Sequence, residues 1–341
     1  MPALTCNGER VIAGQALILP ARRGLTNWRA HGHSSLPRDW GQSPSKALRL
    51  PRTRAELASA FHHDLGHDEA MTDVQERLEL RDRMYGENDL SKLELFAGGY
   101  LNFGYWRDID ARGGLTVEHR VASQEAMYRL AADALGIRDG DRVLDVGCGR
   151  GKGTALVAEE YPVREIYGTD LLEVQVDRAK NANAAAIAAM PGRLHYVAGA
   201  ASRLPLPERS MHRVFSVEAA QHFEDIPGFA AEAHRVLAPS GVLAVATFFA
   251  TAAGRGPALA ERLDTFASGV DLATGVEEFR GTLAAAGFAG VTSESIGEHV
   301  FPGLDRWLAR TAYASTWARE WLGCYRDGLV DYYLITATRA G

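Results

Sequence analysis

RVLDVGCGRGKGT, residues 142–154, joins an apolar run to a loop rich in glycine. Residues 142–146 predict a short buried strand, because apolar side chains surround a single acid, Asp145, near its carboxyl end. The loop glycines are Gly147, Gly149 and Gly151. Because glycine lacks a Cβ, the chain can turn sharply there and a ligand can approach the main chain closely. Residues 154–159 continue as a helix, so the stretch predicts the strand, loop and helix unit that binds nucleotides in open α/β sheets.

The spacing of these glycines argues against two common nucleotide-binding loops. A dinucleotide loop, G-x-G-x-x-G, needs glycine where the chain has Lys152 or, in the next register, Thr154. A phosphate loop, G-x-x-x-x-G-K-[ST], fails because Val146 and Gly153 stand at its first and last positions. The pattern that remains, D-x-G-x-G-x-G, suits a ligand without a pyrophosphate, held by backbone at its amino-acid end and by an acid at its ribose.

A second acid follows at the end of the next predicted strand. Residues 165–170 read EIYGTD, and Asp170 lies about 20 residues beyond the glycine loop, where a ribose diol is bound in such sheets. Charge-assisted hydrogen bonds at this position contribute roughly 1.5 to 3 kcal/mol each. We therefore expect Asp170 to bind the ribose.

Four segments, in order, resemble motifs of the class I S-adenosylmethionine-dependent methyltransferases. They are VLDVGCGRG, YGTD, LPLPERSMHRVFSVEAAQHF and EAHRVLAPSGVLAV, and the likeness covers about residues 89–339. The resemblance implies an α/β, doubly wound, Rossmann-like fold with a seven-stranded, mostly parallel sheet, an antiparallel last strand and a helical, aromatic N-terminal lid. It also implies S-adenosyl-L-methionine as the cofactor and a small-molecule acceptor of the natural-product type.

The resemblance places the methyl donor along these motifs. The expected cofactor-binding residues are Asp145, Gly147, Cys148, Gly149, Gly151, Asp170, Leu171, Ala200, Ala201 and Val217. Relatives commonly carry an aspartate at the position of Ala200, where it accepts a hydrogen bond from the adenine amino group. Its replacement by alanine is expected to weaken donor affinity by about 1 kcal/mol.

Composition bounds the class of protein. The chain has 341 residues, of which 46% are hydrophobic and 23% charged, which fits either one large globular domain or one domain with appendages. A net charge of -6 gives no reason to expect nucleic acid, and no apolar run is long enough to span a membrane. Three scattered cysteines predict neither a disulfide framework nor a metal site, which favours a reducing, cytoplasmic location. A homo-oligomer remains open.

Three regions are expected along the chain. Residues 1–70 predict a poorly ordered basic extension, and the alternatives are a targeting or partner-binding arm or upstream sequence before a true start at Met71. Residues 71–117 predict a helix and the aromatic lid, and residues 118–341 the donor-binding domain.

The aromatic lid, residues 93–106, reads LELFAGGYLNFGYW and is too interrupted by glycine for one continuous helix. Such a segment can simply pack against the edge of the sheet. It also resembles the N-F-G-Y-W stretch that several small-molecule methyltransferases fold over the donor, where aromatic faces attract a sulfonium. The expected substrate-lining residues are Tyr100, Tyr105 and Trp106, together with Gln221 from another segment.

Polar side chains follow the predicted strand 214–217, at the edge where ligands bind in doubly wound sheets. If the chain turns helical at once, Glu218 and His222 lie four apart on one face. A histidine is suited to remove the proton of a hydroxyl acceptor, so oxygen methylation with His222 as general base is favoured. Alternatively, Glu218 and aromatic faces would stabilise the cation formed when the carbon of an isoprenoid, alkene or aromatic ring is methylated. A non-catalytic nucleotide-binding module is a third alternative.

The remaining pattern completes the expected sheet. Helices are expected at 73–84, 118–135, 172–189, 226–237 and 277–286, strands at 194–198, 242–249, 291–296 and 331–338, and a loop at 250–257. Tyr313, Trp317 and Trp321 recur every fourth residue. This stripe is typical of core packing, and the alternative is that it walls a hydrophobic acceptor pocket.

Overall fold

The structure is a computed structural model that describes residues 73–110 and 112–341. The expected basic extension, residues 1–70, lies outside the described residues. In the described part of the chain, no helix is long and apolar enough to cross a membrane.

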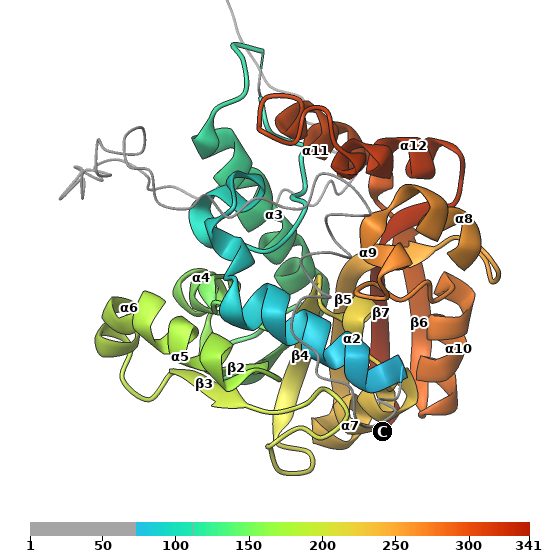
Figure 1. Cartoon of the computed structure of the whole chain (residues 1–341). Helices are drawn as coiled ribbons and strands as arrows, with labels where there is room; N and C mark the ends of the chain where they lie inside the picture. The colour runs from blue at the N-terminus through green and yellow to red at the C-terminus, as the bar shows by residue number, and fades with distance from the viewer. Residues whose placement is uncertain (1–72, 111) are drawn as a thin grey trace, which may run out of the picture. The chain divides into compact units, whose positions relative to one another are not determined.

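A seven-stranded sheet in the order β3-β2-β1-β4-β5-β7-β6 organises this part of the chain (Figure 1). Its strands are β1 Asp141–Val146, β2 Val163–Asp170, β3 Leu194–Ala198, β4 Met211–Val217, β5 Leu237–Ala250, β6 Phe288–Ser295 and β7 Val330–Arg339. The first five strands are parallel to one another, and β7 runs antiparallel to both β5 and β6. The expected doubly wound fold with an antiparallel last strand is confirmed.

Helices cover both faces of this sheet. They are α2 Asp73–Arg81, α3 Val117–Leu135, α4 Lys152–Glu160, α5 Glu173–Ala182, α6 Ala184–Ala189, α7 Ile226–Val236, α8 Gly256–Arg262, α9 Asp264–Ala267, α10 Val276–Ala285, α11 Phe301–Leu308 and α12 Glu320–Arg326. The side chains of successive residues of β1 point to opposite faces of the sheet and belong to two different hydrophobic cores. Val143 belongs to the core that includes residues of α3, α4 and α5, and Leu144 to the core that includes residues of α7 and α10. Both residues are fully buried, so β1 is central to the fold.

The long helix α3 illustrates how local sequence sets an element. Thr116 begins it as an N-cap whose side chain accepts a hydrogen bond from the backbone of His119. Gly136 ends it in the left-handed conformation at φ 58. Between these caps, Met127 and Ala131 are fully buried and pack against the sheet.

Two of the expected helices end or divide differently in the structure. The helix expected at 172–189 is split into α5 and α6, because the Asn183 side chain donates to the carbonyl oxygens of Ala179 and Arg150 and interrupts the helix. The helix expected at 73–84 ends as α2 at Arg81 and continues as a π-helical turn, Asp82–Glu87. We call residues 73–87 the cover segment.

Ion pairs fix the cover segment to the loop after β4. Both Arg77 and Arg81 donate to the carboxylate of Glu224, at 2.9 and 2.6 Å. Arg81 also donates to the carbonyl oxygen of Val270. In Figure 1, α2 crosses in front of the sheet. The cover segment therefore reaches the carboxyl ends of the strands, where ligands bind in this type of fold.

Candidate active site

A cavity of about 850 Å³ opens at the carboxyl ends of β1, β2 and β4. Its volume is near the upper end of the range for ligand pockets. One side is formed by the loops after these strands, and the other by the cover segment, the aromatic lid and the segments 264–271 and 304–321. Residues that lie far apart in the sequence therefore enclose one space.

The glycine loop forms a cradle that side chains would fill. Gly147 has φ 81, and a Cβ added there would lie 2.3 Å from the Cβ of Ala219. Gly147, Cys148 and Gly149 line the cavity. Gly151 does not line it, because it lies behind the loop against the ring of Tyr196. The exposed main chain fits a nucleotide ligand that approaches the backbone closely.

Asp170 and Asp145 occupy different places beside this loop. Asp170 lines the cavity and accepts hydrogen bonds from the backbone N–H of Gly149 at 2.9 Å and of Leu172 at 3.1 Å. Asp145 does not line the cavity, because its side chain faces α4 and accepts a hydrogen bond from the Thr154 hydroxyl at 2.7 Å. Burial raises the pKa of Asp145 to about 7. Asp145 is thus placed to support the loop, and Asp170 to meet a ligand.

The other residues expected at the donor lie on the same side of the cavity. Leu171, Ala200, Ala201 and Val217 all line it. They follow or end the strands β2, β3 and β4, so they form its apolar edge beside the glycine loop. Their contact with the donor stays a prediction.

The chain does not turn into an α-helix after β4. Glu218 adopts a left-handed conformation at φ 46, and only a short 3-10 turn, Ala220–His222, follows. The condition under which Glu218 and His222 would share one helical face is therefore not met. Both side chains nevertheless line the cavity, together with Gln221.

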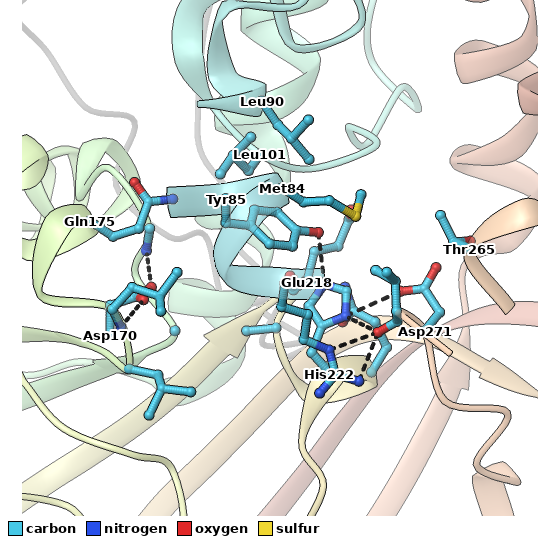
Figure 2. A pocket seen from close by; sticks show the side chains of 18 of the residues that line it. Met84, Tyr85, Leu90, Leu101, Asp170, Gln175, Glu218, His222, Thr265 and Asp271 are labelled. Atoms are coloured by element: carbon cyan, nitrogen blue, oxygen red, sulfur yellow. Dashed lines mark hydrogen bonds and ion pairs between the residues drawn. The ribbon is translucent and has the colours of Figure 1, made fainter. Parts of the chain in front are cut away.

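His222 is held on both of its ring nitrogens (Figure 2). Its Nδ1 lies 2.8 Å from the carbonyl oxygen of Val270 and 3.3 Å from Oδ1 of Asp271. Its Nε2 lies 2.9 Å from the hydroxyl of Tyr85. Burial and the nearby guanidinium of Arg81 lower the pKa of His222 to about 3, and burial raises the pKa of Asp271 to about 7. A neutral ring that donates through Nδ1 to Val270 keeps its lone pair on Nε2.

Glu218 connects three segments. Its Oε1 accepts hydrogen bonds from the backbone N–H of Phe103 in the aromatic lid and from the hydroxyl of Tyr332 in β7, the latter at 2.9 Å. Burial raises the pKa of Glu218 to about 8. The carboxyl group is therefore largely protonated near neutral pH and links the lid to the sheet.

The structure corrects part of the expected aromatic lining. Tyr100 lines the cavity, as does Phe103, but Tyr105 and Trp106 do not. Gly104 at φ 84 turns the chain away, and a Cβ there would lie 2.4 Å from the Ser123 hydroxyl. Trp106 consequently packs with Leu115 and Trp307. The rings of Tyr105 and His299 pack edge to face, with their centroids 5.5 Å apart.

The aromatic residues that recur every fourth position before the last strand fit both interpretations, core packing and the wall of a pocket. Trp317 and Trp321 line the cavity, whereas Tyr313 is buried in the core. Sequence reasoning missed the cover segment and the segment 264–271 as parts of the site. Neither carries a motif, and only the folded chain brings Tyr85 and Asp271 to His222.

Methyltransferases are among the known proteins that this chain resembles. Residues 144–245 match the family described as the methyltransferase domain. Erythromycin 3''-O-methyltransferase of Saccharopolyspora erythraea is 33% identical over 226 residues, which are 62% of this chain and 70% of that protein. The 27-O-demethylrifamycin SV methyltransferase of Amycolatopsis mediterranei is 31% identical over 225 residues, covering 66% of this chain and 75% of that protein. Geranyl diphosphate C-methyltransferase from Streptomyces coelicolor A3(2) shares the fold, with TM-score 0.64 and 17% identity over 78% of this chain and 98% of that one.

Proposed function

The chain belongs to the class I S-adenosylmethionine-dependent methyltransferases, and on this premise we propose that it methylates a hydroxyl oxygen of a small, largely apolar specialised metabolite. The observation that carries the proposal is the position of His222. Its side chain lines the cavity, and its Nδ1 lies within hydrogen-bond distance of the carbonyl oxygen of Val270 and close to the carboxylate of Asp271. A base in this position removes the proton that a hydroxyl must lose when it is methylated.

The donor side of the cavity fits the cofactor. Bound S-adenosylmethionine supplies a methyl group on a sulfonium sulfur, which is already activated for transfer. The glycine loop and Asp170 would bind the nucleoside and amino-acid parts of the donor, and Ala200 and Ala201 would lie along the adenine. The chain then has to align the acceptor and exclude water, and positioning of this kind accounts for much of the rate of such transfers.

The proton of the acceptor passes to Nε2 of His222 in this proposal. The Nδ1–H of the ring stays directed at the carbonyl oxygen of Val270, and the carboxylate of Asp271 at 3.3 Å stabilises the imidazolium that forms. The lowered pKa of His222 alone would make it a weak base, so ionised Asp271 is needed to offset the effect of burial. Positioned general bases contribute about 10² to 10⁴-fold to rate.

The lining on the acceptor side of the cavity suits an acceptor that is mostly apolar and has one polar, reactive end. Its apolar lining includes Met84, Leu90, Leu93, Phe248, Leu304, Leu308 and Trp321. Polar side chains gather near His222, among them Gln221 and Asp271. Two relatives named for methylation of erythromycin and of 27-O-demethylrifamycin SV, the former at an oxygen, add support for this class of acceptor.

Carbon methylation of an isoprenoid, alkene or aromatic ring is the second candidate. The rings of Tyr100, Phe248 and Trp321 on the cavity wall favour it, since aromatic faces stabilise a cation. Glu218 favours it less, because the raised pKa leaves the acid largely neutral and its Oε1 already accepts from Phe103 and Tyr332. We therefore keep oxygen as the proposed acceptor atom.

The test uses S-adenosylmethionine labelled with ¹³C in the transferable methyl group. The protein is incubated with 27-O-demethylrifamycin SV, with hydroxylated macrocyclic metabolites and with geranyl diphosphate as probe acceptors. Mass spectrometry identifies any product by the gain of one methylene unit, and carbon NMR distinguishes an O-methyl from a C-methyl carbon. An O-methyl product supports the proposal, and a C-methyl product replaces it with the second candidate. Failure to bind S-adenosylmethionine would instead support a non-catalytic module.

A further inference from the structure

Lys152 is a half-buried cation on the cavity wall, directly after the glycine loop. Its ammonium lies 5.6 Å from the centroid of the Tyr100 ring. The aromatic lid packs along its side chain, because a Cβ added at Gly99 would lie 3.3 Å from Cε of Lys152. Lys152 therefore stands between the glycine loop and the lid, on the donor side of the cavity.

The neighbouring charges are already paired. The side chain of Arg150 donates to the Ser91 hydroxyl at 2.6 Å and lies 3.5 Å from Oδ2 of Asp89. The carboxylate of Glu125 accepts from the Tyr100 hydroxyl at 3.3 Å and pairs with Arg129 at 3.0 Å. Within residues 73–110 and 112–341, Lys152 itself makes no ion pair, and its contact is with the face of an aromatic ring.

An unpaired ammonium in such a place is costly. Burial, and then the positive charge of Arg150, lower the pKa of Lys152 below its ordinary value. The aromatic face of Tyr100 offsets only part of this cost, because a cation–π contact is weaker than a hydrogen-bonded carboxylate. A ligand carboxylate at the glycine loop would pair with the ammonium of Lys152 and so remove the remaining cost of its burial.

We propose that Lys152 binds the α-carboxylate of the methionine part of S-adenosylmethionine. The inference rests on the proposed function, because it takes the donor to lie with its amino-acid end along the glycine loop. Lys152 lines the cavity beside Gly149, whose main chain forms that part of the wall. No other described lysine lines the cavity, and the arginines that do, Arg81 and Arg150, are engaged by Glu224 and Asp89.

The experiment compares two ligands that differ only at the carboxylate. Isothermal titration calorimetry measures binding of S-adenosylmethionine and of decarboxylated S-adenosylmethionine to the full chain. Lys152→Met removes the charge while keeping the length of the side chain, and Lys152→Arg keeps the charge. Lys180→Met is the matched control, because Lys180 lies on α5, is half-exposed and does not line the cavity.

Lys152→Met should weaken binding of S-adenosylmethionine at least about tenfold and leave binding of the decarboxylated ligand unchanged. Lys152→Arg should keep most of the wild-type affinity, and Lys180→Met all of it. An equal loss for both ligands, or no loss for either, overturns the inference while the proposed donor stands. Wild-type protein that binds neither ligand overturns the proposed function, and the role of Lys152 with it.

Discussion

The hydroxyl of Tyr85 lies 2.9 Å from Nε2 of His222, so a residue of the cover segment occupies the lone pair that an acceptor hydroxyl would use. The same segment is tied by Arg77 and Arg81 to Glu224, two residues beyond His222. The position of the cover segment and the availability of His222 are thus physically coupled. An acceptor that reaches Nε2 has to take the place of the phenol and to compete with the side-chain amide nitrogen of Gln221, which lies 3.2 Å from Nε2.

Tyr85→Phe removes this competing hydrogen bond. A net hydrogen bond of about 1 kcal/mol no longer has to be broken, so the KM for the acceptor should fall about fivefold with little change in kcat. Steady-state kinetics at saturating donor measure both constants. A loss of 10²-fold or more in kcat would contradict this account and show that the phenol itself takes part in proton transfer.

His222→Ala removes the proposed base. We expect kcat to fall by about 10² to 10⁴-fold, while affinity for S-adenosylhomocysteine stays at the wild-type value because the glycine loop is untouched. Turnover assays and calorimetry on the same preparation separate the two effects. His195→Ala, on β3 and away from the cavity, serves as the matched control. Wild-type turnover in the His222 variant would eliminate it as the base.

Asp271→Asn tests the partner of the base through the pH profile. The pKa of Asp271 is raised to about 7, so the carboxylate forms as pH rises through 7 and only then stabilises an imidazolium. Activity of the wild type should therefore rise between about pH 6 and pH 8. The variant should lack this rise and be roughly ten to a hundredfold slower at the upper end. Superimposable profiles for the two proteins would disprove the role.

Asp170→Ala should weaken donor binding at least about tenfold, because one charge-assisted ribose contact and the support of the Gly149 and Leu172 amides are lost together. Asp170→Asn, which keeps an acceptor oxygen for these amides, should lose less. Calorimetry with S-adenosylhomocysteine measures both, and Asp177→Ala on the exposed side of α5 is the control. An unchanged dissociation constant in the alanine variant would remove the ribose assignment.

Glu218→Gln should change how stability depends on pH. The pKa of Glu218 is about 8 in the folded protein and near 4.5 in the unfolded chain, so its neutral form stabilises the fold below pH 4.5 and this contribution is lost as pH rises through 8. Glutamine imitates the neutral acid at every pH. Relative to the variant, the wild type should lose about 1.4 kcal/mol of unfolding free energy per pH unit inside this window. Urea unfolding at several pH values tests this, and parallel curves would contradict it.

Local sequence predicted the donor side of the site better than the acceptor side. The glycine loop and Asp170 follow from strand ends and from backbone that only glycine adopts, which are local properties. The partners of His222 depend on tertiary contacts, since Tyr85 comes from a segment 137 residues earlier. The turn at Gly104 also decides which lid rings reach the cavity, and the alternation of aromatic residues does not encode it.

Strand β7 follows the other six described strands in the sequence but lies between β5 and β6 in the sheet. The five parallel strands are complete once residue 250 has left the ribosome, so the donor half can form on the nascent chain. The strand that carries Tyr332 follows only later: Tyr332, whose hydroxyl donates to Glu218, lies 82 residues (332 − 250) beyond the end of β5. During that interval β5 presents an open edge to other chains. Translation pauses between residues 250 and 330 would therefore favour misassembly more than pauses earlier in the message.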